Sequence, residues 1–205
     1  MTDAITGPIL LPSFPALKSD SPFMLDWGGP LTPQNGGAVQ TIMRLGTRSG
    51  LEFVLPTMPT EPLGRQWSAM LRLAKLYGAL LPFGQDGFRV GAPGAPVVDG
   101  AGQSGSLLKL RSLTRGYAVR LGQAFSLVHG GRRYLHFAAS QGMAAQDGTL
   151  TVAIFPMLRV IPADGDVCEF ARPMIQGSLS GNQVKWSRQT APWTDLGTIT
   201  ITEDE

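Results

Sequence analysis

The chain has 205 residues, with 17 Lys or Arg against 15 Asp or Glu and a formal net charge of +2. A charge balance this small is not that of a nucleic-acid-binding domain, so we expect no sequence-specific nucleic acid among its partners. The single cysteine, Cys168, excludes an intramolecular disulfide framework and a cysteine-based zinc cluster.

The composition favours a fold made mainly of short strands. The chain contains 26 Gly and 16 Pro, and only 16% of its residues are charged. This profile is typical of many strands joined by turns rather than of a helical bundle. We therefore expect a mainly β protein.

Residues 1–37 are rich in Pro and Gly, and we expect them to form an extended N-terminal arm with a short strand. Pro8, Pro12 and Pro15 interrupt the first apolar run, and no basic segment precedes it. The sequence therefore predicts neither a signal peptide nor a membrane anchor here. Two strands are predicted next, at 38–46 and 51–58, joined as a hairpin.

One helix is predicted over residues 61–81. Thr60 is a suitable N-cap, Glu61 and Pro62 suit the first turn, and Pro82 with Gly84 would end the helix. Apolar residues recur at steps of three and four, which indicates one buried face packed on a sheet. These residues are Leu63, Trp67, Met70, Leu71, Ala74, Tyr77 and Leu81.

The segment 97–108, VVDGAGQSGSLL, contains the G-x-G-x-x-G pattern of dinucleotide-binding loops. That chemistry requires a helix after the glycines and an acidic residue roughly 20 positions later. The residues after Gly105 instead follow strand alternation, and no Asp or Glu occurs between Asp99 and Asp147. We expect no dinucleotide cofactor, and interpret the loop as a flexible entry into a separate small domain.

Strands are predicted after this loop at 106–112, 124–129, 132–138 and 150–155, with Gly130-Gly131 as a tight turn between the middle two. They suggest a small β-barrel or OB-like insertion domain over 96–166. Three further strands are predicted at 167–176, 183–189 and 196–202, where Ile199 and Ile201 alternate with threonines. Residues 38–95 and 167–205 would then form one discontinuous β-sandwich that carries the helix.

The sequence offers little support for catalysis. His129 and His136 flank the Gly130-Gly131 turn without a nearby carboxylate or cysteine, which is too few ligands for a zinc site. The chain has no P-loop and no G-x-S-x-G elbow. We therefore predict that the protein is not an enzyme and has no metal site, catalytic site or cofactor.

A basic stretch is the one candidate for ligand contact. Between Gly100 and Gln146 there are six Lys or Arg residues and no acidic residue. They can form a solvated face of the β domain, or contact an anionic surface or an acidic neighbouring subunit. Arg132, Arg133 and Tyr134 combine charge with an aromatic face, and form the candidate site for an anionic partner.

Four segments between residues 38 and 195 form an ordered pattern. A strand ends in Leu-Pro-Thr-Met (55–58), a helix bears Trp67, and the glycine-rich segment 94–112 follows. An apolar strand then ends in FPMLR (155–159), and a late strand contains Trp186-Ser187. In this order the segments resemble the distal tail (tail hub) proteins of long-tailed bacteriophages and related prophages.

The resemblance implies a β-sandwich domain with one helix, which forms a six-fold ring, and an outer barrel-like insertion. It also implies a structural role at the virion tail tip, assembled in the cytoplasm of the bacterial host. The expected partners are further copies of the chain in a hexamer, the tail tube protein, and the tail hub and fibre proteins. The alternative function is a tail-tip module whose insertion binds host-surface glycans.

Overall fold

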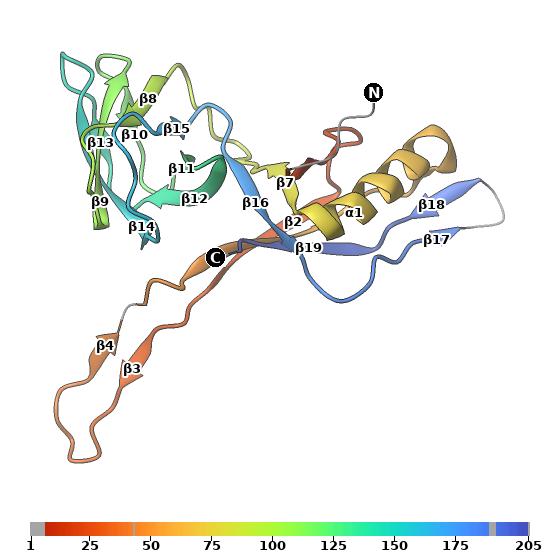
Figure 1. Ribbon diagram of the computed structural model, residues 1–205, viewed down its shortest axis with the longest axis horizontal. Helices are drawn as coiled ribbons and strands as arrows, with labels where there is room; N and C mark the ends of the chain where they lie inside the picture. The colour runs from red at the N-terminus through yellow and green to blue at the C-terminus, as the bar shows by residue number, and fades with distance from the viewer. Residues whose placement is uncertain (1–6, 43, 189–191, 205) are drawn as a thin grey trace. The chain divides into compact units, whose positions relative to one another are not determined.

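The computed structural model describes residues 7–42, 44–188 and 192–204 (Figure 1). These residues are mainly in strands, with one α-helix and one closed six-stranded barrel, so the predicted fold class is confirmed. The chain forms two compact units. The sheet unit comprises the described residues of Met1–Phe23, Ser49–Pro82 and Met174–Asp204, and the barrel unit comprises Met24–Arg48 and Phe83–Pro173.

The sheet unit is built on a six-stranded sheet with the order β1-β7-β16-β19-β5-β2. These strands are β1 (Ile9–Leu10), β7 (Ala79–Pro82), β16 (Met174–Leu179), β19 (Thr198–Thr202), β5 (Arg48–Val54) and β2 (Ser19–Leu25). A three-stranded sheet joins β17 (Ser187–Arg188), β18 (Trp193–Asp195) and β6 (Met58–Pro59). Ile199 and Ile201 are buried while Thr198 is exposed, which confirms the alternation predicted for the last strand.

The helix is shorter than predicted: α1 spans Arg65–Tyr77, after a short irregular turn, η1 (Thr60–Gly64). Thr60 does not cap it, because its hydroxyl hydrogen-bonds to that of Thr194 and Glu61 has an extended backbone. Gly78 ends the helix with a φ of 86° and donates its N–H to the carbonyl of Ala74. Within α1 the predicted buried face is confirmed at Trp67, Leu71 and Ala74, whereas Met70 is half-buried and Tyr77 is 46% exposed, so the prediction is wrong for Tyr77.

The hairpin predicted at 38–58 is wrong. β4 (Gln40–Ile42) pairs with β3 (Gly29–Leu31), whereas β5 lies in the sheet between β19 and β2. The physical reason is burial, because Leu51 and Phe53 of β5 are fully buried and the backbone N–H and C=O groups of a buried strand need hydrogen-bond partners along both edges. Residues 7–37 are correspondingly not one arm, since β1 and β2 are strands of the six-stranded sheet, and residues 1–6 of the predicted arm lie outside the described residues.

The barrel has the closed strand order β11-β12-β14-β9-β8-β15. Its strands are β8 (Gly94–Val98), β9 (Gly105–Leu113), β11 (Ala124–His129), β12 (Arg132–Ala138), β14 (Leu150–Leu158) and β15 (Val167–Glu169). A two-stranded ladder, β10 (Ala118–Val119) with β13 (Gly142–Met143), accompanies it. Its interior is filled by apolar side chains, which include Leu108, Leu110, Phe125, Leu127, Val152, Ile154 and Phe170.

The tight turn at Gly130-Gly131 is confirmed, because His129 pairs with Arg132 and both glycines have positive φ. The strand predicted at 167–176 is divided between the units. Its first part, β15, pairs with both β11 and β8 and closes the barrel, and its second part is β16 of the sheet. Around the barrel strands the units therefore divide at 82/83 and 173/174, rather than at 95/96 and 166/167, and they divide again at 23/24 and 48/49.

Candidate interaction surfaces

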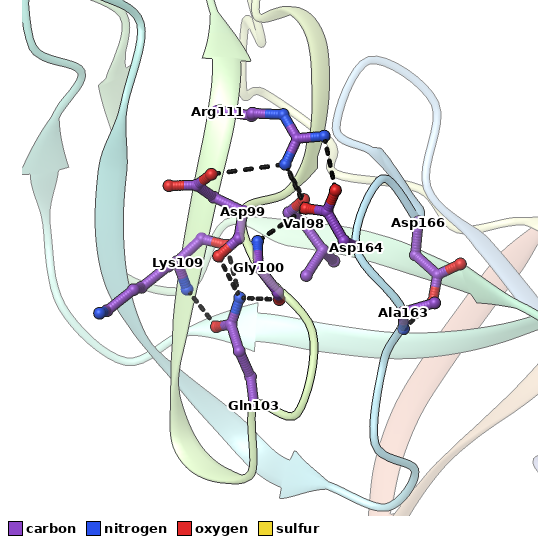
Figure 2. A network of polar contacts seen from close by, with 9 residues as sticks. All are labelled: Val98, Asp99, Gly100, Gln103, Lys109, Arg111, Ala163, Asp164 and Asp166. Carbon is purple, nitrogen blue, oxygen red and sulfur yellow. Dashed lines mark hydrogen bonds and ion pairs between the residues drawn. The ribbon is translucent and has the colours of Figure 1, made fainter.

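The glycine-rich loop lies inside a β-hairpin of the barrel unit (Figure 2). β8 and β9 on its two sides pair antiparallel, with Val98 opposite Leu110. The strand predicted after the glycines is confirmed, and no helix follows that could place its N-terminus on a phosphate. The interpretation of the loop as the entry into a separate domain is wrong, since both flanking strands belong to the barrel.

Side chains hold this loop in place (Figure 2). The amide nitrogen of Gln103 donates to the carbonyls of Asp99, Gly100 and Lys109, at 2.9, 3.1 and 3.2 Å. Gln103 Oε1 accepts the N–H of Lys109 at 2.7 Å, so one side chain joins both strands of the hairpin. A phosphate-binding loop presents backbone N–H groups to its ligand, and the N–H of Lys109 is already taken by Gln103.

A second part of the network links the loop to the segment between β14 and β15. Arg111 donates to the carbonyl of Val98 at 2.8 Å and binds the carboxylate of Asp164. Asp164 also accepts the N–H of Gly100 at 2.8 Å. The hydrogen bonds from Arg111 and from the Gly100 backbone lower the pKa of Asp164 below its usual value. The arrangement is a structural clamp between two loops.

The histidines have separate surroundings. His129 Nδ1 lies 2.7 Å from Asp166 Oδ2 at the barrel surface. His136 is buried, stacks on Phe125, and its Nδ1 donates to the carbonyl of Pro156 at 2.9 Å. Burial lowers the pKa of His136 to about 4, so its neutral form is held at neutral pH.

Cys168 and the acidic residues are the remaining side chains that could bind a metal ion or react. Among the residues that the structure describes, no group of three or more His, Cys, Asp or Glu side chains is placed to hold a metal ion. Burial raises the pKa of the Cys168 thiol, which makes it a poor nucleophile at neutral pH.

The structure divides the predicted anionic-partner site between different environments. Arg133 is paired with Glu169, with Nε 2.8 Å from Oε2 and Nη2 2.9 Å from Oε1. Tyr134 is 7% exposed, and the guanidiniums of Arg132 and Arg159 lie 5.9 and 5.2 Å from its ring centre. The sequence did not identify Arg159, which is 25 positions from Tyr134 along the chain.

A recess of about 230 Å³ adjoins this cluster and is lined by Leu45, Gly46, Tyr134, Arg159 and Val160. Most of these lining residues are apolar, and Arg159 is the one charged residue among them. The recess and the cation–π pairs suit an aromatic or partly apolar group better than a highly charged one. Charge at the site is also reduced by the Arg133–Glu169 pair.

A second candidate surface is the apolar hairpin, defined here as residues 24–45 and containing β3 and β4 (Figure 1). No charged residue occurs between Asp26 and Arg44. Seven large apolar side chains of this segment are exposed, and Trp27 reaches 57%. They are Met24, Leu25, Trp27, Leu31, Val39, Ile42 and Leu45. A two-stranded ribbon is marginally stable alone in water, and contiguous exposed apolar surface is typical of interaction sites, so this hairpin is a candidate docking surface.

A third candidate surface is a groove of about 590 Å³ in the sheet unit. Four of its lining side chains are apolar and buried, and are called the floor here: Leu71 from α1, Leu179, Leu196 and Ile199. The other lining residues come from Ser180 and the segments 183–187 and 195–200, and are mostly polar apart from Val184 and Trp186. Arg72 lies 5.2 Å from the ring centre of Trp186. Sequence reasoning missed this groove because its residues come from four separate segments.

No protein-family model and no curated protein matches this chain. Among the described residues, no helix is both long enough and apolar enough to cross a membrane.

Proposed function

We propose that this protein is a structural, non-enzymatic component of the tail tip of a long-tailed bacteriophage or related prophage particle. Six copies would form a ring that joins the tail tube to the hub and fibre proteins. The observation that carries the proposal is the ordered resemblance of residues 39–83, 94–112, 150–170 and 182–193 to distal tail proteins. The particle would be assembled in the bacterial host cytoplasm.

The exposed apolar surface supports an assembly role. The apolar hairpin leaves seven large side chains in water, which is unfavourable for a chain that works as a monomer. Such a surface is typical of a subunit interface that is covered only in the assembled particle. Heterologous contacts between identical subunits close into a ring when the rotation per subunit divides a full turn.

The proposal is tested by native mass spectrometry and negative-stain imaging of the purified chain over a concentration series. We expect hexamers and six-fold rings that become more populated as concentration rises. A chain that stays monomeric throughout, both alone and mixed with a tail tube protein of the same particle, would overturn the proposal.

Binding of host-surface glycans by the barrel unit receives less support. Of the three residues predicted for that site, Arg133 is engaged by Glu169 and Tyr134 is buried. Arg132 is half-buried, and its guanidinium lies 5.9 Å from the centre of the Tyr134 ring. Arg132→Glu would abolish binding to host envelope fractions at low salt if this alternative were correct, while leaving ring formation unchanged.

A further inference from the structure

The groove in the sheet unit contains an incompletely paired strand. β16 ends at Leu179, opposite Ile201, and the N–H of Ser180 still donates to the carbonyl of Thr200 at 2.9 Å. The chain then turns at Gly181, and among the described strands β5 alone pairs with Thr198 and Ile199. The backbone N–H and C=O groups of successive residues point to opposite edges of a strand, so those of Thr198 point to the same edge of β19 as those of Thr200. This is the edge that pairs with β16 farther along, and at Thr198 it can accept an added strand.

The turn at Gly181, where the chain leaves the edge of β19, is hydrogen-bonded to α1. Lys75 Nζ donates to the carbonyls of Leu179 and Gly181, with 2.6 Å to Leu179. The chain is thereby fixed at the point where β16 stops, which keeps the edge of β19 accessible in the groove. Leu71, Leu179, Leu196 and Ile199 give the groove apolar lining, beside polar residues that include Lys185 and Asp195. The occupant that fits is an extended segment with apolar side chains and few charges.

The apolar hairpin is an extended segment with apolar side chains and few charges. β3 and β4 form a two-stranded sheet, so each has one outer edge available for pairing. The register places Gly29 opposite Ile42 and Leu31 opposite Gln40, so Leu31 and Ile42 share one face. The strands β3 and β4 contain no charged residue. Asp26 lies before β3, and its carboxylate accepts hydrogen bonds from the Gly28 N–H and the Thr47 hydroxyl.

The hairpin also carries the kind of surface that an interface needs. Its seven large apolar side chains are each 36–58% exposed, and contiguous exposed apolar surface is typical of protein–protein contact sites. Every copy of the chain carries both the hairpin and the groove. Copies can therefore join head to tail, which is the type of contact that a ring requires.

We propose that the apolar hairpin of one copy docks in the groove of a second copy and adds a strand beside Thr198. Leu31 and Ile42 would enter the apolar floor, and backbone hydrogen bonds would extend the six-stranded sheet across the subunit boundary. This inference rests on the proposed ring function and specifies which two surfaces make each contact in the ring.

The test uses one variant of each surface in the full chain. Leu31→Asp with Ile42→Asp places charges on the hairpin, and Val184→Asp places one in the groove lining. All three side chains lie outside the buried core, so circular dichroism and thermal unfolding should match the wild type. Leu121→Asp, at an exposed apolar position of the barrel unit, is the matched control and should assemble normally.

We expect each variant alone to lose every species larger than the monomer in native mass spectra. A mixture of the two should then form a one-to-one dimer and nothing larger. The groove-deficient copy supplies an intact hairpin, and the hairpin-deficient copy supplies an intact groove. In a second measurement, Ile42→Cys and Val184→Cys introduced into one chain should form an intermolecular disulfide on mild oxidation.

The outcomes separate this inference from the proposed function. If the wild type forms rings and either variant still does, the hairpin–groove contact is wrong and the ring function stands. If both variants are monomeric but no dimer forms on mixing and no disulfide forms, the contact is also wrong. If the wild type itself stays monomeric with and without a tube protein, the ring function fails as well.

Discussion

The guanidinium of Arg111 on β9 binds the carboxylate of Asp164, with Nη2 3.2 Å from Oδ2, and so joins β9 to the segment between β14 and β15, 53 positions later in the chain. Asp164 in turn accepts the N–H of Gly100. Both charged side chains are substantially exposed, so the pair contributes little to global stability. Its role is local, because it holds the glycine-rich loop against the barrel.

Asp164→Ala should therefore loosen the loop without unfolding the barrel. We expect the amide hydrogens of residues 99–105 to exchange roughly tenfold faster, since local opening no longer breaks the Asp164 contacts. Asp147→Ala is a suitable control, because Asp147 accepts two hydrogen bonds from Thr149 in a different turn. Unchanged exchange at residues 99–105 in Asp164→Ala would contradict the clamp.

The stability of the barrel should depend on pH through His136. Burial lowers the pKa of His136 to about 4, below its ordinary value near 6.5. Between these values the unfolded chain binds the proton and the folded chain does not, so stability is fully present above pH 6.5 and falls toward pH 4. The loss should reach roughly 3 kcal/mol at its largest.

Urea unfolding of the wild type and of His136→Gln at pH 7.5 and 4.5 measures this effect. Glutamine keeps a donor for the Pro156 carbonyl but has no titrating ring. We expect the variant to be less stable at pH 7.5 and to lose less stability on acidification than the wild type. Equal losses in both proteins would show that other groups govern the acid response.

Gly177 of β16 should tolerate no side chain. A Cβ there would lie 2.0 Å from the carbonyl oxygen of Thr202, and this neighbour is backbone of the adjacent strand. Gly177→Ala should cost about 3 kcal/mol or more, because β16 and β19 must separate. At Gly29 a Cβ would meet nothing within 4 Å, so Gly29→Ala should stay within about 0.5 kcal/mol of the wild type.

Arg133 and Glu169 should be energetically coupled. Both side chains are largely buried and make two hydrogen bonds at 2.8 and 2.9 Å. A double-mutant cycle with Arg133→Ala and Glu169→Ala should give a coupling energy of roughly 1 kcal/mol. The same cycle with Arg132 in place of Arg133 should give a smaller value, because Arg132 lies against the ring of Tyr134.

Local patterns in the sequence were sufficient for some elements. The two glycines at 130 and 131 specify a tight turn because both adopt positive φ, and the alternation at Ile199 and Ile201 specifies a half-buried strand. The spacing of Trp67, Leu71 and Ala74 correctly identified the buried helix face. The helix ends were less well determined, since Thr60 found a tertiary partner in Thr194 instead of capping.

The candidate surfaces were harder to predict than the elements. Arg132, Arg133 and Tyr134 are consecutive in the chain, but alternation along β12 and contacts with Glu169 and Arg159 give them different roles. The groove likewise combines α1 with three later segments. No pattern within any one of these segments indicates a cavity, because the cavity exists only between them.

Composition, glycine positions and apolar periodicity thus determined that this is a β protein with one helix and a small second β unit. These are properties of short stretches of backbone, which each residue biases through its own conformational preferences. Only the tertiary structure decided which strands pair, that β15 closes the barrel, and that the hairpin at 24–45 remains uncovered. Strand pairing depends on burial against partners far away in the chain, and the sequence does not encode those partners locally.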